Sequence, residues 1–303
     1  MRGRRVPDRE GEELSKQPLR LAVAEAERIL REAGVASPRA DAELLAAHVV
    51  GVERTKLTMV PLVSVSVVEE LHRLVRERSK GIPLQHITGW AAMGAITVSV
   101  GPGVFVPRPE TELLLAWGLA HLRRTRQPTI VDLCTGSGVL ALAFANARPD
   151  ASVHAVERDP SALAWARRNA NALVGAGDRP VDLRFGDVGD PELLAELDGT
   201  VDLVVCNPPY VPEGTPVPVE VAEHDPHAAV FSGLDGMDTI RHVVHCAVRL
   251  LRPGGALALE HDDTHGEAVP ELLRARQVLT EVADHPDLAG RPRFATALRR
   301  SLS

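Results

Sequence analysis

Four consecutive residues, Asn207-Pro208-Pro209-Tyr210, follow an apolar run and have groups that suit one kind of chemistry. Because prolines cannot continue a strand ladder, the chain leaves the sheet here with the Pro208 carbonyl free. This carbonyl and the Asn207 side-chain oxygen are two acceptors, enough for both N–H bonds of a planar NH₂ group. Tyr210, the only tyrosine of the chain, offers a ring on which such a group can stack. A planar amide or aniline-like nitrogen is a poor nucleophile, so its methylation needs this kind of positioning and charge stabilisation.

A second cluster of candidate residues lies upstream, in the segment VDLCTGSG. Gly136 and Gly138 let the backbone approach a ligand, and the helix that follows presents free N–H groups. Glu157, at the end of the next predicted strand, is placed to accept hydrogen bonds from ribose hydroxyls. Asp187 and Val188 lie at the tip of the third strand. Together these positions predict a cofactor that contains a nucleoside.

Two nucleoside cofactors have to be compared. Gly136-x-Gly138-x-x-Ala141 satisfies a loose dinucleotide fingerprint, which favours NAD. Asp132 opposes it, because a carboxylate just before the loop repels a pyrophosphate but can receive an ammonium group. No hydride-transfer site is recognisable downstream, whereas the tetrad at residues 207–210 suits methyl transfer. We therefore expect S-adenosylmethionine.

Alternating strand and helix segments after Pro128 position both clusters. Five short apolar segments, which begin at residues 129, 152, 181, 201 and 255, are predicted strands, and the segments between them, ELLAEL (192–197) included, are predicted helices. The tail from residue 278 predicts two more strands, with an antiparallel hairpin. This order is typical of an α/β fold with a mostly parallel seven-stranded sheet and helices on both faces.

Composition and periodicity divide the chain into four parts. Residues 1–17 are polar and are expected to be a disordered extension. Residues 18–86 show three amphipathic helical segments, which predict a small helical bundle. Residues 87–108 alternate and then turn at prolines, which predicts a hairpin linker, and residues 109–303 form the α/β domain. The bundle is either a packing module or a recognition domain for a bulky substrate, and we favour recognition.

Charge and composition argue against several classes of function. The net charge of −7 opposes broad electrostatic capture of nucleic acid, so we expect no direct nucleic-acid partner. The three cysteines form no CxxC pair and the histidine pairs have no matching thiolates, so we expect no metal site. No apolar run is long enough to span a membrane and no signal peptide is recognisable. We expect a cytoplasmic protein with no membrane association.

Four segments together resemble the HemK family of protein-(glutamine-N5) methyltransferases. They are NPPY, VPRPETE (106–112), DLCTGSG and HDPHAAVFSGLDGMD (224–238). The resemblance runs from about Pro18 to the C-terminus, and it implies a class I methyltransferase fold that uses S-adenosylmethionine. The substrate that it implies is the glutamine of the GGQ loop in peptide chain release factors.

The resemblance also implies roles by position. The tetrad, Asn207 to Tyr210, would bind the substrate glutamine. Cys134 stands where a glycine is usual, and Glu157 replaces the commoner aspartate. With Asp132 and Asp187 added from the reasoning above, the candidate cofactor residues are Asp132, Cys134, Thr135, Gly136, Ser137, Gly138, Glu157, Asp187, Val188 and Asn207.

Three alternatives are weighed against this interpretation. The tetrad is shared with enzymes that methylate adenine or cytosine in nucleic acid, but those are expected to have a basic groove and a base-reading domain. A related group acts on a ribosomal protein glutamine and continues differently after VPR. A non-catalytic adaptor that keeps only the cofactor fold would not need an intact tetrad.

Overall fold

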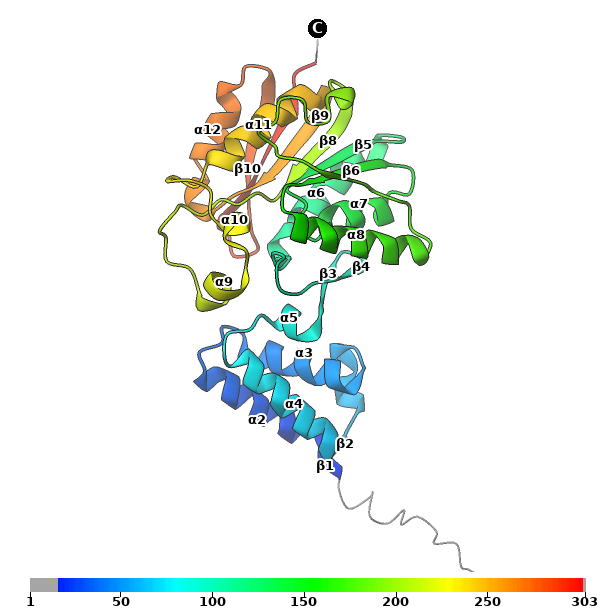
Figure 1. Cartoon of the computed structure of the whole chain (residues 1–303), viewed down its shortest axis with the longest axis vertical. Helices are drawn as coiled ribbons and strands as arrows, with labels where there is room; N and C mark the ends of the chain where they lie inside the picture. The colour runs from blue at the N-terminus through cyan, green and yellow to red at the C-terminus, as the bar shows by residue number, and fades with distance from the viewer. Residues whose placement is uncertain (1–15, 302–303) are drawn as a thin grey trace, which may run out of the picture. The chain divides into compact units, whose positions relative to one another are not determined.

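A computed structural model of the chain describes residues 16–301 and divides into two compact units. One unit extends to Gly89, and the other begins at Trp90 (Figure 1). The disordered extension predicted for residues 1–17 lies outside the described residues, except for Lys16 and Gln17. These two residues begin a short strand that pairs antiparallel with residues 62–64.

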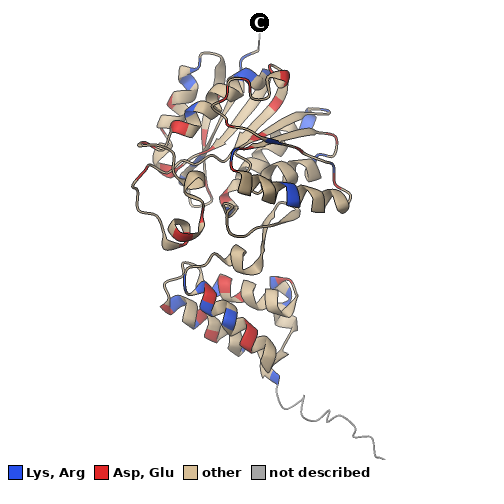
Figure 2. Cartoon of the chain, in the orientation of Figure 1, with Lys and Arg blue, Asp and Glu red and all other residues tan. Residues whose placement is uncertain are grey.

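The first unit is a helical bundle with leucines at its centre. Leu30, Leu45 and Leu71 come from three different helices and are fully buried. The outer faces of these helices have arginines and glutamates in alternation (Figure 2), many of them in ion pairs one helical turn apart. Its elements are β1 (Lys16–Pro18), α2 (Leu19–Glu32), α3 (Pro38–Val50), η1 (Arg54–Met59), β2 (Leu62–Ser64), α4 (Val65–Arg78) and α5 (Leu84–Thr88).

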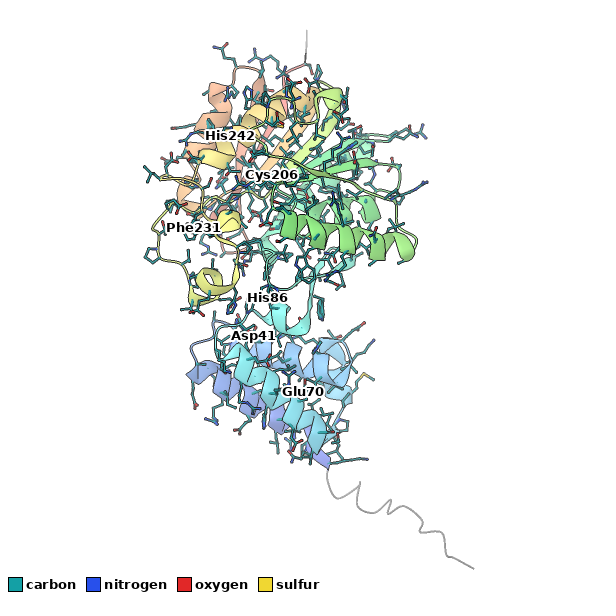
Figure 3. All side chains as sticks on the ribbon, in the orientation of Figure 1. Asp41, Glu70, His86, Cys206, Phe231 and His242 are labelled. Carbon is teal, nitrogen blue, oxygen red and sulfur yellow. The ribbon has the colours of Figure 1, made fainter. Side chains whose placement is uncertain are left out.

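One ion pair of this bundle is buried. Arg78 Nε donates to Asp41 Oδ2 at 2.7 Å, and Arg78 Nη1 donates to the Ile82 carbonyl at 2.9 Å. Figure 3 labels Asp41, which is buried in the bundle, and Glu70, whose side chain on α4 is exposed and pairs with Arg73. Because the guanidinium has acceptors on two sides, it fixes the end of α4 against α3.

The second unit contains the predicted seven-stranded sheet, which is confirmed. The strand order is β10-β11-β9-β8-β5-β6-β7, with parallel pairing from β9 to β7 and antiparallel pairing at β11 and β10. The chain first adds strands on one side of β5 and then on the other, so the order reverses between β5 and β8. The strands are β5 (Thr129–Leu133), β6 (Ser152–Glu157), β7 (Asp182–Phe185), β8 (Val201–Cys206), β9 (Leu251–Glu260), β10 (Leu279–Pro286) and β11 (Pro292–Arg299).

Helices cover both faces of this sheet, as the uninterrupted apolar strands require. Successive residues of β8 alternate between two cores: Leu203 packs with α6, α7 and α8, whereas Val204 packs with α11 and α12. Across residues 16–301, no helix combines the length and the apolar character that a membrane span requires. The helices are α6 (Glu112–His121), α7 (Val139–Ala147), α8 (Pro160–Gly175), α9 (Val219–His224), α10 (His227–Val230), α11 (Asp238–Leu250) and α12 (Ala268–Ala275), with short 3₁₀ turns η2 (Pro109–Thr111), η3 (Leu122–Arg124), η4 (Ala195–Leu197) and η5 (Asp263–His265).

The hairpin that precedes the sheet packs into the core of the second unit. It is formed by β3 (Trp90–Met93) and β4 (Ile96–Ser99). Met93 and Ile96 are buried in the same cluster as α7. The alternation of the sequence predicts this hairpin. Its apolar face packs in the core of the second unit, whereas the sequence assigned residues 87–108 to a separate linker.

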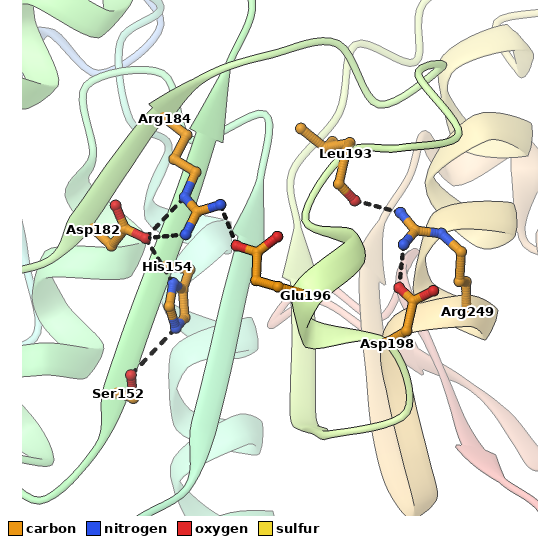
Figure 4. Close-up of polar contacts among 8 residues, drawn as sticks. All are labelled: Ser152, His154, Asp182, Arg184, Leu193, Glu196, Asp198 and Arg249. Carbon is orange, nitrogen blue, oxygen red and sulfur yellow. Dashed lines mark hydrogen bonds and ion pairs between the residues drawn. The ribbon is translucent and has the colours of Figure 1, made fainter.

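The segment between β7 and β8 differs from the sequence expectation. ELLAEL, predicted as a helix, forms only the 3₁₀ turn η4, because Leu194 adopts a left-handed conformation with φ 56°. Two arginines fix this segment on either side (Figure 4). Arg184 of β7 pairs with Glu196, and Arg249 of α11 pairs with Asp198 and the Leu193 carbonyl.

Gly118 shows how closely α6 packs on the sheet. A Cβ at this position would lie 2.7 Å from Phe144 Cζ and 2.9 Å from Leu203 Cδ2, both in buried side chains. We expect Gly118→Ala to lower the free energy of unfolding by about 1–2 kcal/mol. Gly175→Ala is the matched control, since a Cβ at this last residue of α8 meets nothing within 4 Å.

The three tryptophans of the chain, at residues 90, 117 and 165, all lie in the second unit, so their fluorescence in urea reports its unfolding. The control is expected to leave the free energy of unfolding unchanged or to raise it by up to about 1 kcal/mol, the usual gain of alanine over glycine in a helix. A Gly118→Ala variant as stable as this control would contradict the packing argument.

Candidate active site

The carboxyl ends of β5, β6 and β8 open into a cavity of about 280 Å³ in the second unit. This is the edge where ligands bind in open α/β sheets, beside the point where the strand order reverses. Of the residues predicted from the sequence, Asp132, Cys134, Thr135, Gly136, Ser137, Glu157, Val188, Asn207, Pro208, Pro209 and Tyr210 line it. Gly138 and Asp187 do not.

The glycine loop after β5 is shaped by three residues in the left-handed region. Cys134, Gly136 and Gly138 have φ of 58°, 58° and 81°. The loop is fixed by hydrogen bonds from the Thr135 N–H to the Val156 carbonyl (3.0 Å) and from the Gly138 N–H to the Thr135 carbonyl (2.9 Å). Cys134 takes a conformation that glycine adopts at lower cost, which agrees with its departure from the family pattern.

The two glycines of this loop have different roles. A Cβ at Gly136 would meet nothing within 4 Å, so this residue faces open space in the cavity. A Cβ at Gly138 would lie 3.1 Å from the Ala166 Cβ of α8. Gly138 therefore permits close packing of α7 and α8, and it does not face the ligand space.

Asp132 is a buried carboxylic acid between the loop and the start of α7. Its Oδ2 accepts from the Thr135 hydroxyl at 2.5 Å and from the Ala141 N–H at 3.2 Å, and only 1% of its surface is exposed. Burial raises the pKa of Asp132 to about 7. A cationic group that entered the cavity would favour the ionised form, so this position suits an ammonium group.

Glu157 uses both carboxylate oxygens to shape the loop. Oε2 accepts from the Gly136 N–H and Oε1 accepts from the Asp159 N–H, each at 2.8 Å. Each carboxylate oxygen keeps a further lone pair, which can accept a hydroxyl hydrogen. Glu157 lines the cavity at the end of β6, as the sequence predicts for a ribose contact.

Asp187 points away from the cavity. Its side chain is 54% exposed, accepts from the Gly189 N–H at 2.8 Å and lies 3.6 Å from Arg158. Val188, the next residue, is buried and lines the cavity. Of this predicted pair, only Val188 lines the cavity.

The tetrad follows β8 and is connected to two residues that sequence reasoning did not single out. Asn207 Nδ2 donates to the Thr111 hydroxyl at 3.0 Å, and this hydroxyl donates to Glu260 Oε2 at 2.9 Å. The Tyr210 hydroxyl donates to Glu260 Oε1 at 3.3 Å. Thr111 lies in the PRPETE segment and Glu260 ends β9, beside β8. The signal in the sequence that could have identified Glu260 is its place, as an acidic residue, at the carboxyl end of a predicted strand.

A further contact joins the other two quoted motifs. Arg108 Nη2 donates to Asp225 Oδ2 at 2.5 Å, and the Val106 N–H donates to Asp225 Oδ1 at 3.3 Å. The Asp225 side chain is buried, which raises its pKa in opposition to Arg108. Residues 226 and 228–230, which follow Asp225, line the cavity, so this ion pair positions one wall of the site.

Comparison with known proteins decides the family. Residues 22–89 match the PrmC N-terminal domain, and residues 96–224 match the methyltransferase small domain. A release factor glutamine methyltransferase of Mycolicibacterium smegmatis is 52% identical over 281 residues, which cover 93% of this chain and 98% of the relative. The chain belongs to the release factor glutamine methyltransferase family.

Other members of this family are similar over almost their whole length. The release factor glutamine methyltransferase of Mycobacterium tuberculosis H37Rv is 47% identical, covering 93% of this chain and 91% of the relative. That of Streptomyces coelicolor is 49% identical, covering 91% and 96%. Among solved structures, the hMettl16 catalytic domain, in complex with MAT2A 3'UTR hairpin 6, has a TM-score of 0.51 at 15% identity over 68% of this chain and 76% of that chain. That likeness concerns the fold alone.

The residues of this family member fit S-adenosylmethionine. Gly136 leaves open space, Asp132 can receive an ammonium group and Glu157 can receive hydroxyls. Val188 and Ala162 contribute apolar surface for a base. A buried carboxylate without a basic partner beside the loop would disfavour a pyrophosphate. The donor and acceptor set therefore matches an aminoacyl sulfonium nucleoside better than a dinucleotide.

Proposed function

We propose that this protein methylates the side-chain amide nitrogen of a glutamine in a peptide chain release factor, within its GGQ motif. The observation that supports this proposal is one cavity lined by both the glycine loop after β5 and the NPPY tetrad after β8. A methyl donor and a planar amide acceptor can meet only where both sets of residues face the same space. Release factor glutamine methyltransferases that are 46–52% identical support the substrate.

The tetrad positions the acceptor amide. Its two N–H groups donate to the Asn207 side-chain oxygen and the Pro208 carbonyl, and the amide plane stacks on Tyr210. Both acceptors lie where positive charge develops on the nitrogen, so they stabilise the transition state more than the ground state. The nitrogen becomes acidic only as the methyl group arrives, so no strong general base is required, and the one proton that the nitrogen loses passes to water.

The glycine loop and its neighbours position the cofactor, S-adenosylmethionine, which when bound supplies an electrophilic methyl group. Asp132 receives the ammonium group, Glu157 accepts hydrogen bonds from the ribose, and Gly136 allows the backbone to come close. The loop residues Cys134, Thr135 and Ser137 complete the lining. Asp187 contributes indirectly, through its contacts with Gly189 and Arg158.

The remaining parts of the chain follow from this substrate. We assign the helical bundle, predicted from the sequence as residues 18–86, to recognition of the folded release factor. Release factors act with ribosomes, so we place the protein in the cytoplasm. No direct nucleic-acid contact is needed for this reaction, in agreement with the net charge of −7.

A substrate panel tests the proposed function. The protein is incubated with S-adenosylmethionine labelled in its methyl group and with either a release factor, a ribosomal protein extract, duplex DNA or no acceptor. We expect label in the release factor alone. Label in DNA would favour an amino-methyltransferase of nucleic acid. If none of the acceptors became labelled, a non-catalytic adaptor would be favoured.

A further inference from the structure

We propose that Thr111 and Glu260 are positioning residues, which turn the side-chain amide of Asn207 so that its oxygen faces the substrate nitrogen. The proposal rests on the proposed function, because it concerns the same acceptor site. Neither residue belongs to the tetrad: Thr111 ends η2 and Glu260 ends β9. Both are almost fully buried, with 3% and 1% of their surface exposed.

Counting hydrogens along the chain of contacts fixes the direction of each bond. An ionised carboxylate is an acceptor only, and a threonine hydroxyl has a single hydrogen. The Thr111 hydrogen therefore goes to Glu260 Oε2 at 2.9 Å, which leaves the hydroxyl oxygen as an acceptor. Asn207 can satisfy this acceptor only with its NH₂ end, at 3.0 Å. Its oxygen is then at the opposite end of the amide.

The direction of this amide decides whether the substrate can bind productively. The substrate nitrogen has two N–H groups and needs acceptors. If Asn207 were turned around, its NH₂ would face the substrate NH₂, and two donors would meet without an acceptor. Oxygen and nitrogen of an amide have almost the same shape, so packing alone cannot choose between the two orientations. The Thr111–Glu260 pair makes this choice through hydrogen bonding.

Glu260 also fixes the other substrate contact of the tetrad. Its Oε1 accepts from the Tyr210 hydroxyl at 3.3 Å, so one carboxylate orients both the amide and the aromatic ring. The charged groups that face Glu260 are Arg293 from β11 and Glu110 from η2. His261, the next residue, is engaged with Asp284 at 2.9 Å.

The same geometry links activity to pH. Burial raises the pKa of Glu260 to about 7, against the opposing effects of the hydrogen bond from Thr111 and of Arg293. Below this value the carboxyl gains a proton and can donate a hydrogen bond to the Thr111 oxygen. The Thr111 hydroxyl can then donate its own hydrogen bond to the Asn207 oxygen. The amide turns around, and the acceptor for the substrate is lost. Turnover with saturating cofactor and substrate is therefore expected to fall as the pH decreases through about 7.

The test compares Thr111→Val with Thr111→Ser. Valine removes the hydroxyl at nearly constant volume, whereas serine keeps it. With release factor as substrate, we expect Thr111→Val to lower kcat about tenfold, as for a buried donor left unpaired, and to remove the decrease of kcat below pH 7. Thr111→Ser is expected to recover most of kcat and to show again the decrease of kcat below pH 7. Thr280→Val, which removes a hydroxyl from β10 outside the cavity, is the matched control.

Further measurements separate positioning from a loss of structure. The Kd of S-adenosylmethionine, measured by calorimetry, is expected to stay within about twofold in Thr111→Val, because the cofactor residues are not changed. Glu260→Gln, which cannot ionise, is expected to lower kcat and to show no acid decrease either. A Thr111→Val enzyme with wild-type kcat, or with the acid decrease intact, would overturn the proposal. Absence of methylation by the wild-type protein would instead refute the proposed function.

Discussion

Replacing Asn207 with alanine is expected to lower kcat for methyl transfer to a release factor by about 100- to 1000-fold, the usual cost of removing one preorganised transition-state contact. The Asn207 oxygen is one of the two acceptors that we assign to the substrate N–H groups, and the Pro208 carbonyl serves the other. The NH₂ end of Asn207 is already used by Thr111 at 3.0 Å. The variant loses both the acceptor and its support.

Cofactor binding separates this role from general damage. The Kd of S-adenosylmethionine is expected to rise less than about tenfold in Asn207→Ala, because the glycine loop, Asp132 and Glu157 are unchanged. Asn171→Ala, an exposed position on α8, is the matched control and is expected to behave as wild type. Single-turnover kinetics with saturating cofactor measure the effect. Full activity of Asn207→Ala would refute the role given to the tetrad.

Replacing Asp132 with asparagine is expected to raise the Kd of S-adenosylmethionine by at least about 30-fold, as when one partner of a buried charge pair is removed. Asparagine keeps an oxygen that can accept from the Thr135 hydroxyl and the Ala141 N–H, so the loop is preserved. What is lost is the negative charge for the ammonium group. Asp190→Asn, in an exposed turn, is the control.

The pH dependence of this effect has a definite sign. The pKa of Asp132 in the folded protein is raised to about 7, so the ionised fraction increases as the pH rises from 6 to 8. Wild-type affinity for the cofactor is expected to increase over this range, and Asp132→Asn affinity is not. The raised pKa also means that ionising Asp132 opposes folding, so the contribution of Asp132 to the stability of the free protein decreases as the pH rises from about 4 towards 7.

Asparagine cannot ionise, so the Asp132→Asn variant has no buried charge that opposes folding. Free Asp132→Asn is therefore expected to be at least as stable as wild type at pH 8, as measured by thermal unfolding. Calorimetry at several pH values measures the affinities. A variant with wild-type affinity and wild-type pH dependence would show that the ammonium group lies elsewhere.

The second unit was predictable from the sequence because its signals are local. Apolar runs such as VDLVVC alternate with helical segments, and this order alone specifies a mostly parallel sheet. Ligands lie at the carboxyl ends of such strands, so the sequence alone places Glu157 and Asn207 at one edge of the sheet. ELLAEL failed as a helix because a six-residue segment is too short to be stable alone, and Leu194 adopts a left-handed conformation.

The connections within the site were not predictable for the opposite reason. Thr111 and Glu260 are 149 residues apart, and no periodicity relates a 3₁₀ turn to the end of a distant strand. Gly138 and Gly136 have the same residue type and similar φ, so the sequence cannot tell packing from ligand space. Asp187 and Val188 are neighbours at a strand tip. Which of the two side chains faces the cavity depends on the residue at which the strand ends.

The most direct measurement of the central claim is to locate the transferred methyl group in the product. Release factor is incubated with the protein and S-adenosylmethionine, digested, and sequenced by tandem mass spectrometry, with Asn207→Ala run in parallel. The account predicts one added methyl group on the side-chain nitrogen of the GGQ glutamine, absent in the Asn207→Ala reaction. Methylation of a different residue type, or of the same glutamine by both proteins, would contradict it.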